Sequence, residues 1–291
     1  MNGLLVFDKP PGLTSHDVVA LVRRATGERS VGHLGTLDPM ATGVLPLLLG
    51  KWTRLAQFFG AAEKHYEGAI RFGWATDTYD AEGQAAAAPQ PLTATLEALR
   101  ALGRRFHGTL DQVPPVFSAK KIGGVPAHKL ARAGKDVPVK PARITIHAFE
   151  LHDLQDETAA FTMHVSAGGY VRSVAHELGQ LAGCGAHLCR LRRVQAGPFR
   201  LDAAATKDQL VDAVNAGTLD HLLLHPRAVL AEMPAVTADE AAQGKLRNGM
   251  AVNLPEFSQA PLVRIFGAGH QLLGIGKRVA GTLIQPFVNL A

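Results

Sequence analysis

The sequence is poor in cysteine and in charge. Its two cysteines, Cys184 and Cys189, exclude a disulfide framework in a chain of 291 residues. His187 lies between them, but no second cysteine pair completes a zinc site, so we expect reduced thiols. Charged residues make up 19% of the chain, below the roughly 25% of an average protein, and 47% of residues are apolar. This composition excludes a disordered chain and predicts a substantial core.

Long apolar runs are also missing. The N-terminal segment "MNGLLVFDKPPG" has a short apolar run before Asp8 and Lys9, which does not fit a signal peptide. The later run from Val44 to Leu49 is too short to span a bilayer. We therefore expect a cytoplasmic protein with no membrane partner.

Basic residues exceed acidic ones by a small margin. Thirty Lys and Arg against 25 Asp and Glu give a formal net charge of +5 and a pI near 9.4. This balance suits a polyanionic partner such as nucleic acid, although a basic protein without such a partner would have the same charge.

The hydrophobic pattern predicts a mixed chain of helices and strands. Strands are expected at 4–7, 44–50, 65–73, 142–151, 159–167 and 187–199. Helices are expected at 14–27, 53–64, 93–108 and 168–183. The tetrads "TKDQ" (206–209) and "TADE" (237–240) have the pattern of capping boxes, and each is predicted to open a helix. After about residue 247, short strands alternate with glycine turns, which indicates a small all-β module of the barrel type.

One carboxylate stands alone in the glycine-rich stretch "GHLGTLDPMATGVLPLLLG", residues 32–50. Pro39 pushes Asp38 out of helical dihedral angles, and the flanking glycines permit tight backbone geometry around it. An aspartate beside Gly and Pro commonly caps a turn. A catalytic carboxylate is the alternative interpretation.

A second unusual stretch, residues 114–141, is rich in Lys and Gly and has no clear period. Long irregular segments inside a compact chain are usually functional or mobile, and a solvated insertion is the alternative. Further along, His176 and Glu177 resemble the start of a zinc-protease motif, but Gln180 stands where the second histidine would be. The metalloprotease interpretation therefore fails.

Six segments together carry a family resemblance. They are "DKPPGLTSHDVV", "GHLGTLDPMATGVLPLLLG", "HYEGAIRFGWATDTYDAEG", "PPVFSAKKIGGVPAHKLARAG", "GGYVRSVAHELG" and "GAHLCRLRRVQAGPF". In this order and spacing the chain resembles the bacterial TruB-type tRNA pseudouridine synthases over nearly its whole length. The resemblance implies isomerisation of uridine 55, in the T loop of tRNA, to pseudouridine, with no cofactor and no catalytic metal.

The same resemblance implies an α+β architecture. Residues 1–230 would form a pseudouridine synthase domain, with a mixed, largely antiparallel central sheet flanked by helices. A basic RNA-clamping segment at about 118–140 would belong to it. Residues 231–291 would form a PUA-like RNA-binding β-barrel. The family also makes a monomer without an obligate protein partner the expected state.

The resemblance assigns roles at the site, and chemistry explains them. Asp38 would be the catalytic acid, because an ionised carboxylate can add to C6 of the base or to C1′ of the ribose, or stabilise positive charge on the sugar. A free aspartate has a pKa near ~3.9, and burial under a base would raise it unless a cation compensates. Arg172 matches the family arginine that pairs with the aspartate. The sequence leaves open which atom Asp38 attacks.

Other residues match positions that hold the base. Tyr66 would stack on the flipped uracil, and Tyr170 and Leu191 would line the pocket. His33 would fill the space that the flipped nucleotide leaves, as a flat wedge rather than a proton donor. By pattern alone Tyr66 and Leu191 could be core residues, and His33 an exposed loop residue.

RNA phosphates would be met by a basic surface comprising Lys9, Lys120, Lys121, Lys129, Arg132 and Lys135. Lys9 is also expected beside the catalytic loop. The clamping segment would close over the T arm and be mobile without RNA. The sequence departs from the family at His128, at "VSAGGY" and at "ELG", positions beside the site rather than at the catalytic acid.

Two other functions share some of these features. A non-catalytic tRNA-binding or tRNA-folding chaperone would need the basic surface and the rings of Tyr66 and His33. It would not need Asp38 paired with an arginine. An aspartyl-phosphate enzyme would need a second acid two residues after the first, where this chain has Met40.

Overall fold

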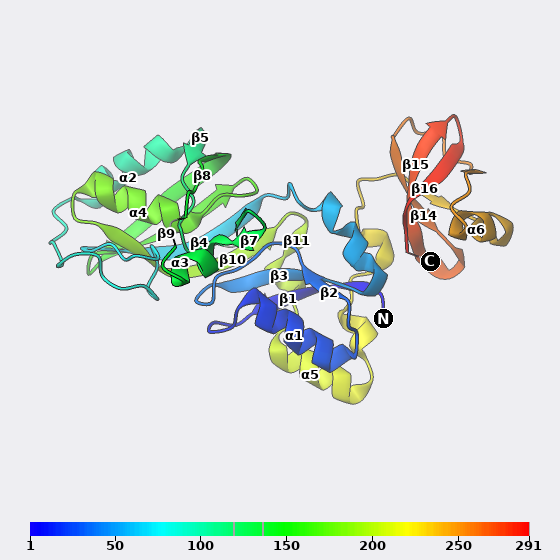
Figure 1. Cartoon of the computed structure of the whole chain (residues 1–291), viewed down its shortest axis with the longest axis horizontal. Helices are drawn as coiled ribbons and strands as arrows, with labels where there is room; N and C mark the ends of the chain where they lie inside the picture. Colours follow the sequence, from blue (N-terminus) through cyan, green and yellow to red (C-terminus); the bar gives the residue numbers. More distant parts are fainter. Residues whose placement is uncertain (119, 136, 291) are drawn as a thin grey trace.

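Over the residues that the structure describes (1–118, 120–135 and 137–290), the computed structural model forms a nine-stranded sheet, a five-stranded sheet and a two-stranded ribbon (Figure 1). The large sheet has the order β1-β3-β10-β4-β9-β8-β5, with β2 beside β3 and β11 beside β10. Its strands are β1 (Gly3–Lys9), β2 (Val31–His33), β3 (Thr42–Leu49), β4 (Lys64–Phe72), β5 (Gly108–Gln112), β8 (Ala142–Gln155), β9 (Thr158–Val165), β10 (Ala186–Ala196) and β11 (Phe199–Arg200).

Neighbouring strands of this sheet run antiparallel, with β10 and β3 as the parallel pair. The expected mixed, largely antiparallel sheet is therefore confirmed. The strand expected at 65–73 is β4, and Tyr66, Gly68, Ile70 and Phe72 share its buried face.

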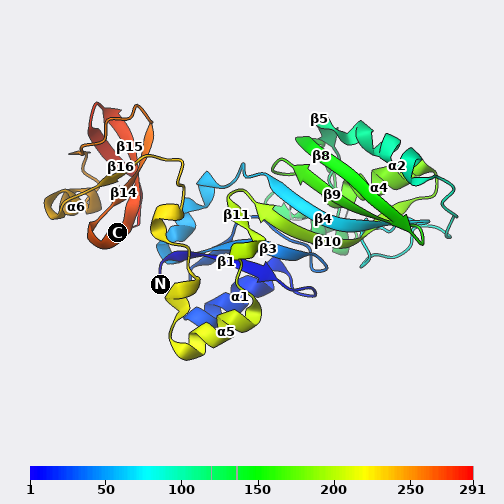
Figure 2. The same ribbon diagram turned by 180° about the vertical axis from the view of Figure 1, so that it is seen from behind.

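Two pairs of helices flank the sheet at different places. The helices α1 (Ser15–Thr26) and α5 (Lys207–Ala216) lie together near β1 and β2, whereas α2 (Leu96–Gly103) and α4 (Val171–Ala182) lie together against β8 and β10 (Figures 1 and 2). The ends of α1 follow the sequence closely. Thr14 and Asp17 form a capping box at its start, and Gly27 adopts a left-handed conformation with φ 68° at its end. Every helix among the described residues is too short or too polar to cross a bilayer.

A separate β module ends the chain. It consists of β12 (Ala235–Thr237), α6 (Glu240–Arg247), β13 (Val252–Asn253), β14 (Leu262–Phe266), β15 (Leu272–Ala280) and β16 (Leu283–Asn289). The strand order is β12-β14-β15-β16-β13, so β12 joins the module although it precedes residue 247. The module therefore begins before residue 247, where the sequence pattern of short strands and glycine turns starts.

The module contacts the first domain through η1 (Gly50–Phe58), a 3₁₀ segment near the N-terminus (Figure 2). The rings of Phe58 and Phe287 lie 6.3 Å apart in an edge-to-face arrangement, and Arg54 donates a hydrogen bond of 2.8 Å to the Asn289 carbonyl. Phe266 and Leu272 belong to the same buried apolar cluster as Leu4 and other residues of the large sheet. One apolar cluster thus joins the two sheets.

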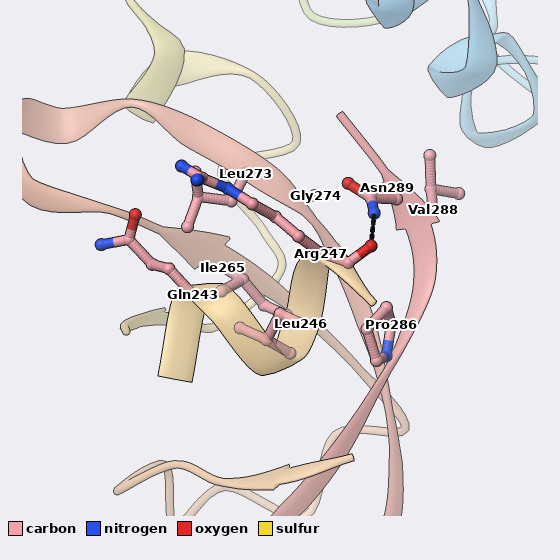
Figure 3. Close-up of a pocket in the computed structure, with 9 residues that line it drawn as sticks. All are labelled: Gln243, Leu246, Arg247, Ile265, Leu273, Gly274, Pro286, Val288 and Asn289. Carbon is pink, nitrogen blue, oxygen red and sulfur yellow. Dashed lines mark hydrogen bonds between the residues drawn. The ribbon is translucent and has the colours of Figure 1, made fainter. Parts of the chain in front are cut away.

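Within the module, α6 covers a small hollow on the sheet (Figure 3). Its lining includes Gln243, Leu246 and Ile265, and its volume is about 10 Å³. This is space for about one water molecule, so the hollow cannot accept a nucleotide.

Several local predictions were wrong. Residues 53–64 do not form an α-helix, since the 3₁₀ segment η1 runs from Gly50 to Phe58 with Trp52 and Leu55 buried. The helix expected at 93–108 spans only Leu96–Gly103 and continues as the 3₁₀ turn η2 (Arg104–Phe106). Residues 114–141 are not wholly irregular, since they contain β6 (Lys121–Ile122), β7 (Val125–Pro126) and α3 (Ala127–Arg132).

The two predicted capping boxes have different outcomes. Thr206 caps α5, and its hydroxyl accepts from the Gln209 amide as predicted. Thr237, however, is the last residue of β12 and pairs with Phe266, which holds its backbone extended. Asp239 caps α6 instead, accepting a hydrogen bond of 2.8 Å from the Ala242 amide.

Candidate active site

A cavity of about 490 Å³ opens between the glycine-rich loop, the sheet and the start of α4. Its volume lies within the roughly 300–1,000 Å³ typical of small-molecule sites. It is lined by residues 35–38, Lys64, Tyr66, Pro114, Lys120, Ala142, residues 168–172, Leu191 and Arg193. These residues come from segments far apart in the sequence.

Asp38 lies in the wall of this cavity and is paired with Arg172. Nη2 of Arg172 donates a hydrogen bond of 3.0 Å to Oδ1 of Asp38, and Nε lies 2.9 Å from Oδ2. The Asp38 side chain remains 31% exposed, whereas that of Arg172 is only 5% exposed. The carboxylate is therefore open to a molecule in the cavity while its cation is enclosed behind it.

Arg172 also binds two other segments. It donates hydrogen bonds of 2.9 Å to the carbonyls of Thr78 and Phe117. Its Nη1 lies 3.4 Å from Oδ2 of the buried Asp80. The sequence indicated only a polar turn around Asp80, so this second acid was missed. Its carboxylate also accepts hydrogen bonds from the Thr78 hydroxyl and the Glu82 backbone amide, as aspartates in turns commonly do. The contact with Arg172 joins residues far apart in the sequence and is seen only in the tertiary structure.

The surroundings of Asp38 change its acidity. Burial raises its pKa, and the negative charge of Asp80 adds to this, while Arg172 and Lys9 oppose it. The direction is the one expected for a carboxylate withdrawn from bulk water. Arg172 favours the ionised form, which a nucleophilic or electrostatic role requires.

The cavity wall carries aromatic and aliphatic groups beside the acid. Tyr66 on β4 and Leu191 on β10 are buried to 8% and 6% exposure. Tyr170 directly precedes α4 and is half-buried, and the Gln112 amide binds both its backbone N–H, at 2.7 Å, and its carbonyl, at 3.0 Å. The structure therefore brings Asp38, Arg172 and these three residues around one cavity.

His33 stands at the end of β2 and is not part of the cavity lining. It is half-buried. Burial lowers its pKa, and the charge of Arg193 lowers it further. Both effects favour the neutral imidazole over the charged one.

The prediction that Lys9 meets phosphate is wrong for this structure. The residue is fully buried, and its ammonium donates hydrogen bonds to the carbonyls of Pro10, at 3.0 Å, and Pro39, at 3.1 Å. Burial lowers its pKa to about 8. Lys9 instead holds the backbone of the residue that follows Asp38, which agrees with its expected place beside the catalytic loop.

Arg193 was also missed from the sequence. It is 1% exposed and donates hydrogen bonds to the carbonyls of Val44, at 2.8 Å, and Gly35, at 3.0 Å. It thus fixes the loop that leads to Asp38. A signal was present, because Arg193 is two residues after the apolar Leu191 on a strand and must share its inward face.

The basic segment contributes one lysine to the cavity. Lys120 lines it, and its ammonium donates a hydrogen bond of 3.1 Å to the Lys140 carbonyl. Lys129, Arg132 and Lys135 are exposed. The side chains of Lys121 and His128 lie outside the described part of the chain, so the predicted phosphate contact of Lys121 stays a prediction.

Comparison with known proteins gives consistent matches along the chain. Residues 23–171 match the model of the TruB family pseudouridylate synthase N-terminal domain. Residues 172–230 match the tRNA pseudouridylate synthase B C-terminal domain, and residues 234–287 match the C-terminal model of pseudouridine synthase II TruB. A tRNA pseudouridine synthase B from Solibacter usitatus is 41% identical over 99% of both chains, and one from Geotalea uraniireducens is 40% identical over 95% of this chain and 92% of its own.

Solved structures share the fold. A chain of a Cbf5–Nop10–Gar1 complex superposes with a TM-score of 0.69 and 26% identity, covering 96% of this chain and 79% of that one. A chain of an H/ACA ribonucleoprotein bound to a substrate RNA gives a TM-score of 0.71 at 23% identity, covering 99% and 85%.

Proposed function

The chain belongs to the TruB family of pseudouridylate synthases, and on this basis we propose that it isomerises uridine 55, in the T loop of tRNA, to pseudouridine. Membership places it among isomerases that act on uridine in tRNA. The position in the T loop and the roles of individual residues belong to the proposal. The protein would act in the cytoplasm as a monomer.

The observation that carries the proposal is the Asp38–Arg172 pair in the cavity wall. A protein that only bound tRNA would have no need of a carboxylate that faces a cavity and is held by a buried arginine. Enclosing two charges costs several kcal/mol unless their contacts compensate, so such a pair is more often found where chemistry uses it.

The reaction requires three events at one nucleotide. The bond from C1′ to N1 of the base breaks, the uracil turns, and a bond from C1′ to C5 forms as C5 loses its proton and N1 takes one up. The Asp38 carboxylate can promote the first event by adding to C6 or to C1′, or by stabilising positive charge on the sugar. Arg172 would keep it ionised and aimed at the cavity.

The detached base must stay in place while it turns. Tyr66 would stack on the uracil, with Leu191 and Tyr170 forming the remaining wall. The target base must first leave the folded T loop, at a cost of a few kcal/mol. His33 would then occupy the vacated space, since its ring lies outside the cavity and its surroundings favour the neutral form.

The rest of the tRNA would be held by the surface around the cavity. Lys120 and Arg132 on the clamping segment would meet phosphates of the T arm, and the segment would close over it. The C-terminal module would extend the contact along the acceptor stem. Recognition would depend mainly on the shape of the T arm.

Tritium release tests the proposal directly, because forming the new carbon–carbon bond expels the hydrogen on C5. Purified protein should release tritium from tRNA carrying 5-³H-uridine, and Asp38→Asn should abolish release while leaving tRNA binding near normal. Asp202→Asn, at a side chain that is 75% exposed, is the matched control and should behave as wild type. Full activity of Asp38→Asn would disprove the assignment, and binding without release by wild type would favour the chaperone alternative.

A further inference from the structure

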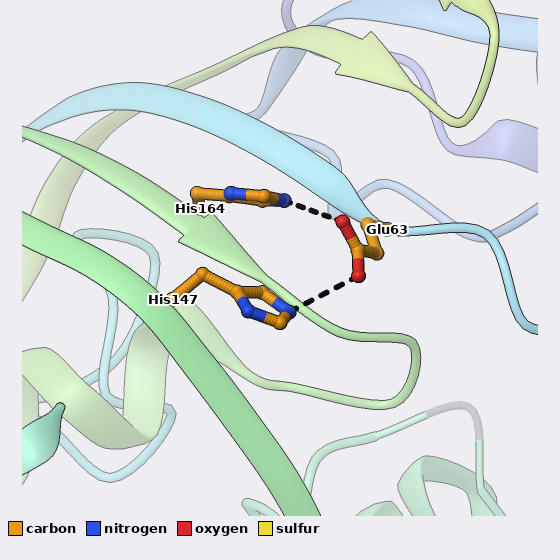
Figure 4. A group of neighbouring side chains, drawn as sticks. All are labelled: Glu63, His147 and His164. Atoms are coloured by element: carbon orange, nitrogen blue, oxygen red, sulfur yellow. Dashed lines mark hydrogen bonds and ion pairs between the residues drawn. The ribbon is translucent and has the colours of Figure 1, made fainter. Parts of the chain in front are cut away.

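Three ligand-type side chains meet on the large sheet outside the cavity (Figure 4). Glu63 directly precedes β4, His164 lies on β9 and His147 lies on β8. The strands are neighbours in the order β4-β9-β8, and His164 pairs in register with Ala148, next to His147. The fold therefore brings Glu63 beside two histidines that lie much further along the chain, His164 by 101 residues.

The three groups converge on one point. One carboxylate oxygen of Glu63 lies 3.1 Å from Nε2 of His147, and the other lies 2.7 Å from Nε2 of His164. One ligand atom from each residue can be chosen so that all lie within 4.8 Å of one another. A tetrahedral zinc ion with ligands at about 2.0–2.1 Å holds neighbouring ligand atoms about 3.3 Å apart. Small side-chain rotations would complete that geometry.

The kinds of donor atom select the kind of ion. Two imidazole nitrogens and one carboxylate oxygen suit zinc and similar first-row divalent ions. Magnesium and calcium prefer sites made of oxygen, which this is not. Three protein ligands leave a fourth position for water. Each neutral imidazole can bind the ion through Nε2 once its proton resides on Nδ1.

The site is accessible and partly preorganised. The side chains of Glu63, His147 and His164 are 50%, 36% and 26% exposed, so an ion can enter from solvent. His65 stacks on His164 with ring centroids 3.8 Å apart and an interplanar angle of 15°. This contact restricts the orientation of the His164 ring before any ion binds.

We propose that Glu63, His147 and His164 form a binding site for Zn²⁺ or a similar divalent transition-metal ion, which would clamp three strands of the large sheet together. Glu63 and His65 alternate along the chain with Lys64 and Tyr66, which line the cavity. Successive side chains of a strand point to opposite faces, so the ion would sit behind the cavity wall. Its role is structural, and it takes no part in the isomerisation.

Zinc titration of the full chain, freed of metal with a chelator, tests this site. Isothermal titration calorimetry should show about one equivalent of tight binding, accompanied by a rise in the thermal midpoint. His147→Ala and Glu63→Gln should each weaken that binding by about tenfold or more, since losing even a supporting partner of a ligand costs that much. Both residues are exposed, so the variants should fold, which circular dichroism would verify.

The control variant is His152→Ala, another exposed histidine of β8 whose ring contacts the Thr162 hydroxyl and lies outside the cluster. It should bind zinc as wild type does. Replacing zinc with Co²⁺ should give the visible absorption of a tetrahedral ion in wild type and not in His147→Ala. Absence of zinc binding in wild type, or equal binding by wild type, His147→Ala and Glu63→Gln, would overturn the proposal.

Discussion

Arg172 contacts both carboxylate oxygens of Asp38 although 134 residues separate the two along the chain. Because Arg172 also binds the Thr78 and Phe117 carbonyls, one guanidinium joins the loop of Asp38 to two other segments of the chain. The position of Asp38 therefore depends on a cation that is almost wholly enclosed by protein.

Replacing Arg172 should affect activity and stability together. Arg172→Ala leaves Asp38 and Asp80 without their cation, and breaking a buried ion pair costs about 3–5 kcal/mol. We expect kcat/KM for tritium release to fall about a hundredfold or more, which corresponds to ~2.7 kcal/mol. Urea unfolding should show the loss of stability.

The variant Arg172→Lys separates the two effects. It keeps a charge near Asp38 but cannot contact both oxygens and two carbonyls at once. It should retain more stability than Arg172→Ala while remaining strongly impaired in turnover. A rate for either variant within about twofold of wild type, well under 1 kcal/mol, would reject a role of the pair in catalysis.

Lys9 should make folding stability depend on alkaline pH. Its pKa is about 8 in the folded chain against an ordinary value of 10.5, so between these values the unfolded chain binds more protons than the folded one. The free energy of unfolding of wild type should therefore rise with pH across this window, relative to Lys9→Met, by at most about 3.4 kcal/mol. Well below pH 8 the ammonium is charged in both the folded and the unfolded chain, so the difference in unfolding free energy between the two proteins should be constant there.

Urea unfolding of both proteins at several pH values from 7 to about 10.5 measures this. Subtracting the two curves removes the contribution of other titrating groups. A difference that stays flat across the window would show that the Lys9 ammonium is not perturbed by burial.

Gly43 in the glycine-rich stretch should tolerate no side chain. Its φ is +102°, and a Cβ placed there would lie 2.2 Å from the carbonyl oxygen of Arg193 on the neighbouring strand. We expect Gly43→Ala to lower the free energy of unfolding by about 3 kcal/mol or more, from backbone strain and overpacking together.

Gly27, at the end of α1, is the matched control for Gly43. Its φ is +68° and a Cβ there meets nothing within 4 Å, so Gly27→Ala should cost only the conformational strain, about 1 kcal/mol. If both variants lost the same free energy of unfolding, the backbone at Gly43 would be able to move away from the Arg193 carbonyl.

Removing residues 231–291 should weaken tRNA binding more than maximal turnover. The cavity lining lies entirely before this boundary, so kcat should change little. KM should rise by about tenfold, or 1.4 kcal/mol of binding free energy, if the module contacts the acceptor stem. The deletion also removes Phe266 and Leu272 from the shared apolar cluster, so stability must be measured alongside. An unchanged KM in folded protein would count against an RNA-binding role for the module.

Local features were predictable where a few neighbouring residues decide the structure. The start and end of α1 at Thr14 and Gly27, the cap of α5 at Thr206 and the buried face of β4 all follow from short-range rules. Predictions failed where a distant partner decides. Thr237 has the sequence of a helix cap, but pairing with Phe266 keeps it in a strand.

The candidate site likewise combines features that the sequence predicted with contacts that depend on distant residues. The segment that carries Asp38 and the resemblance to one enzyme family were readable from the chain, together with Arg172 as the partner cation. Asp80 was not, because its sequence surroundings are those of an ordinary turn, and Arg193 was overlooked although its spacing from Leu191 placed it on the inward face of the strand. The burial of Lys9 was equally hidden, since its carbonyl partner Pro39 lies 30 residues away.

The sequence by itself determined the family, the class of reaction and local features such as the ends of α1 and the cap of α5, because these depend on residue identity and on neighbours along the chain. Only the tertiary structure decided which polar side chains lie close together. It places Asp38 beside Arg172 and Asp80, Lys9 against the Pro39 carbonyl, and Glu63 beside two histidines on the other face of the sheet. The physical reason is that electrostatic and metal-ligand interactions act over a few ångströms in space, and the sheet order places side by side residues that sequence distance separates.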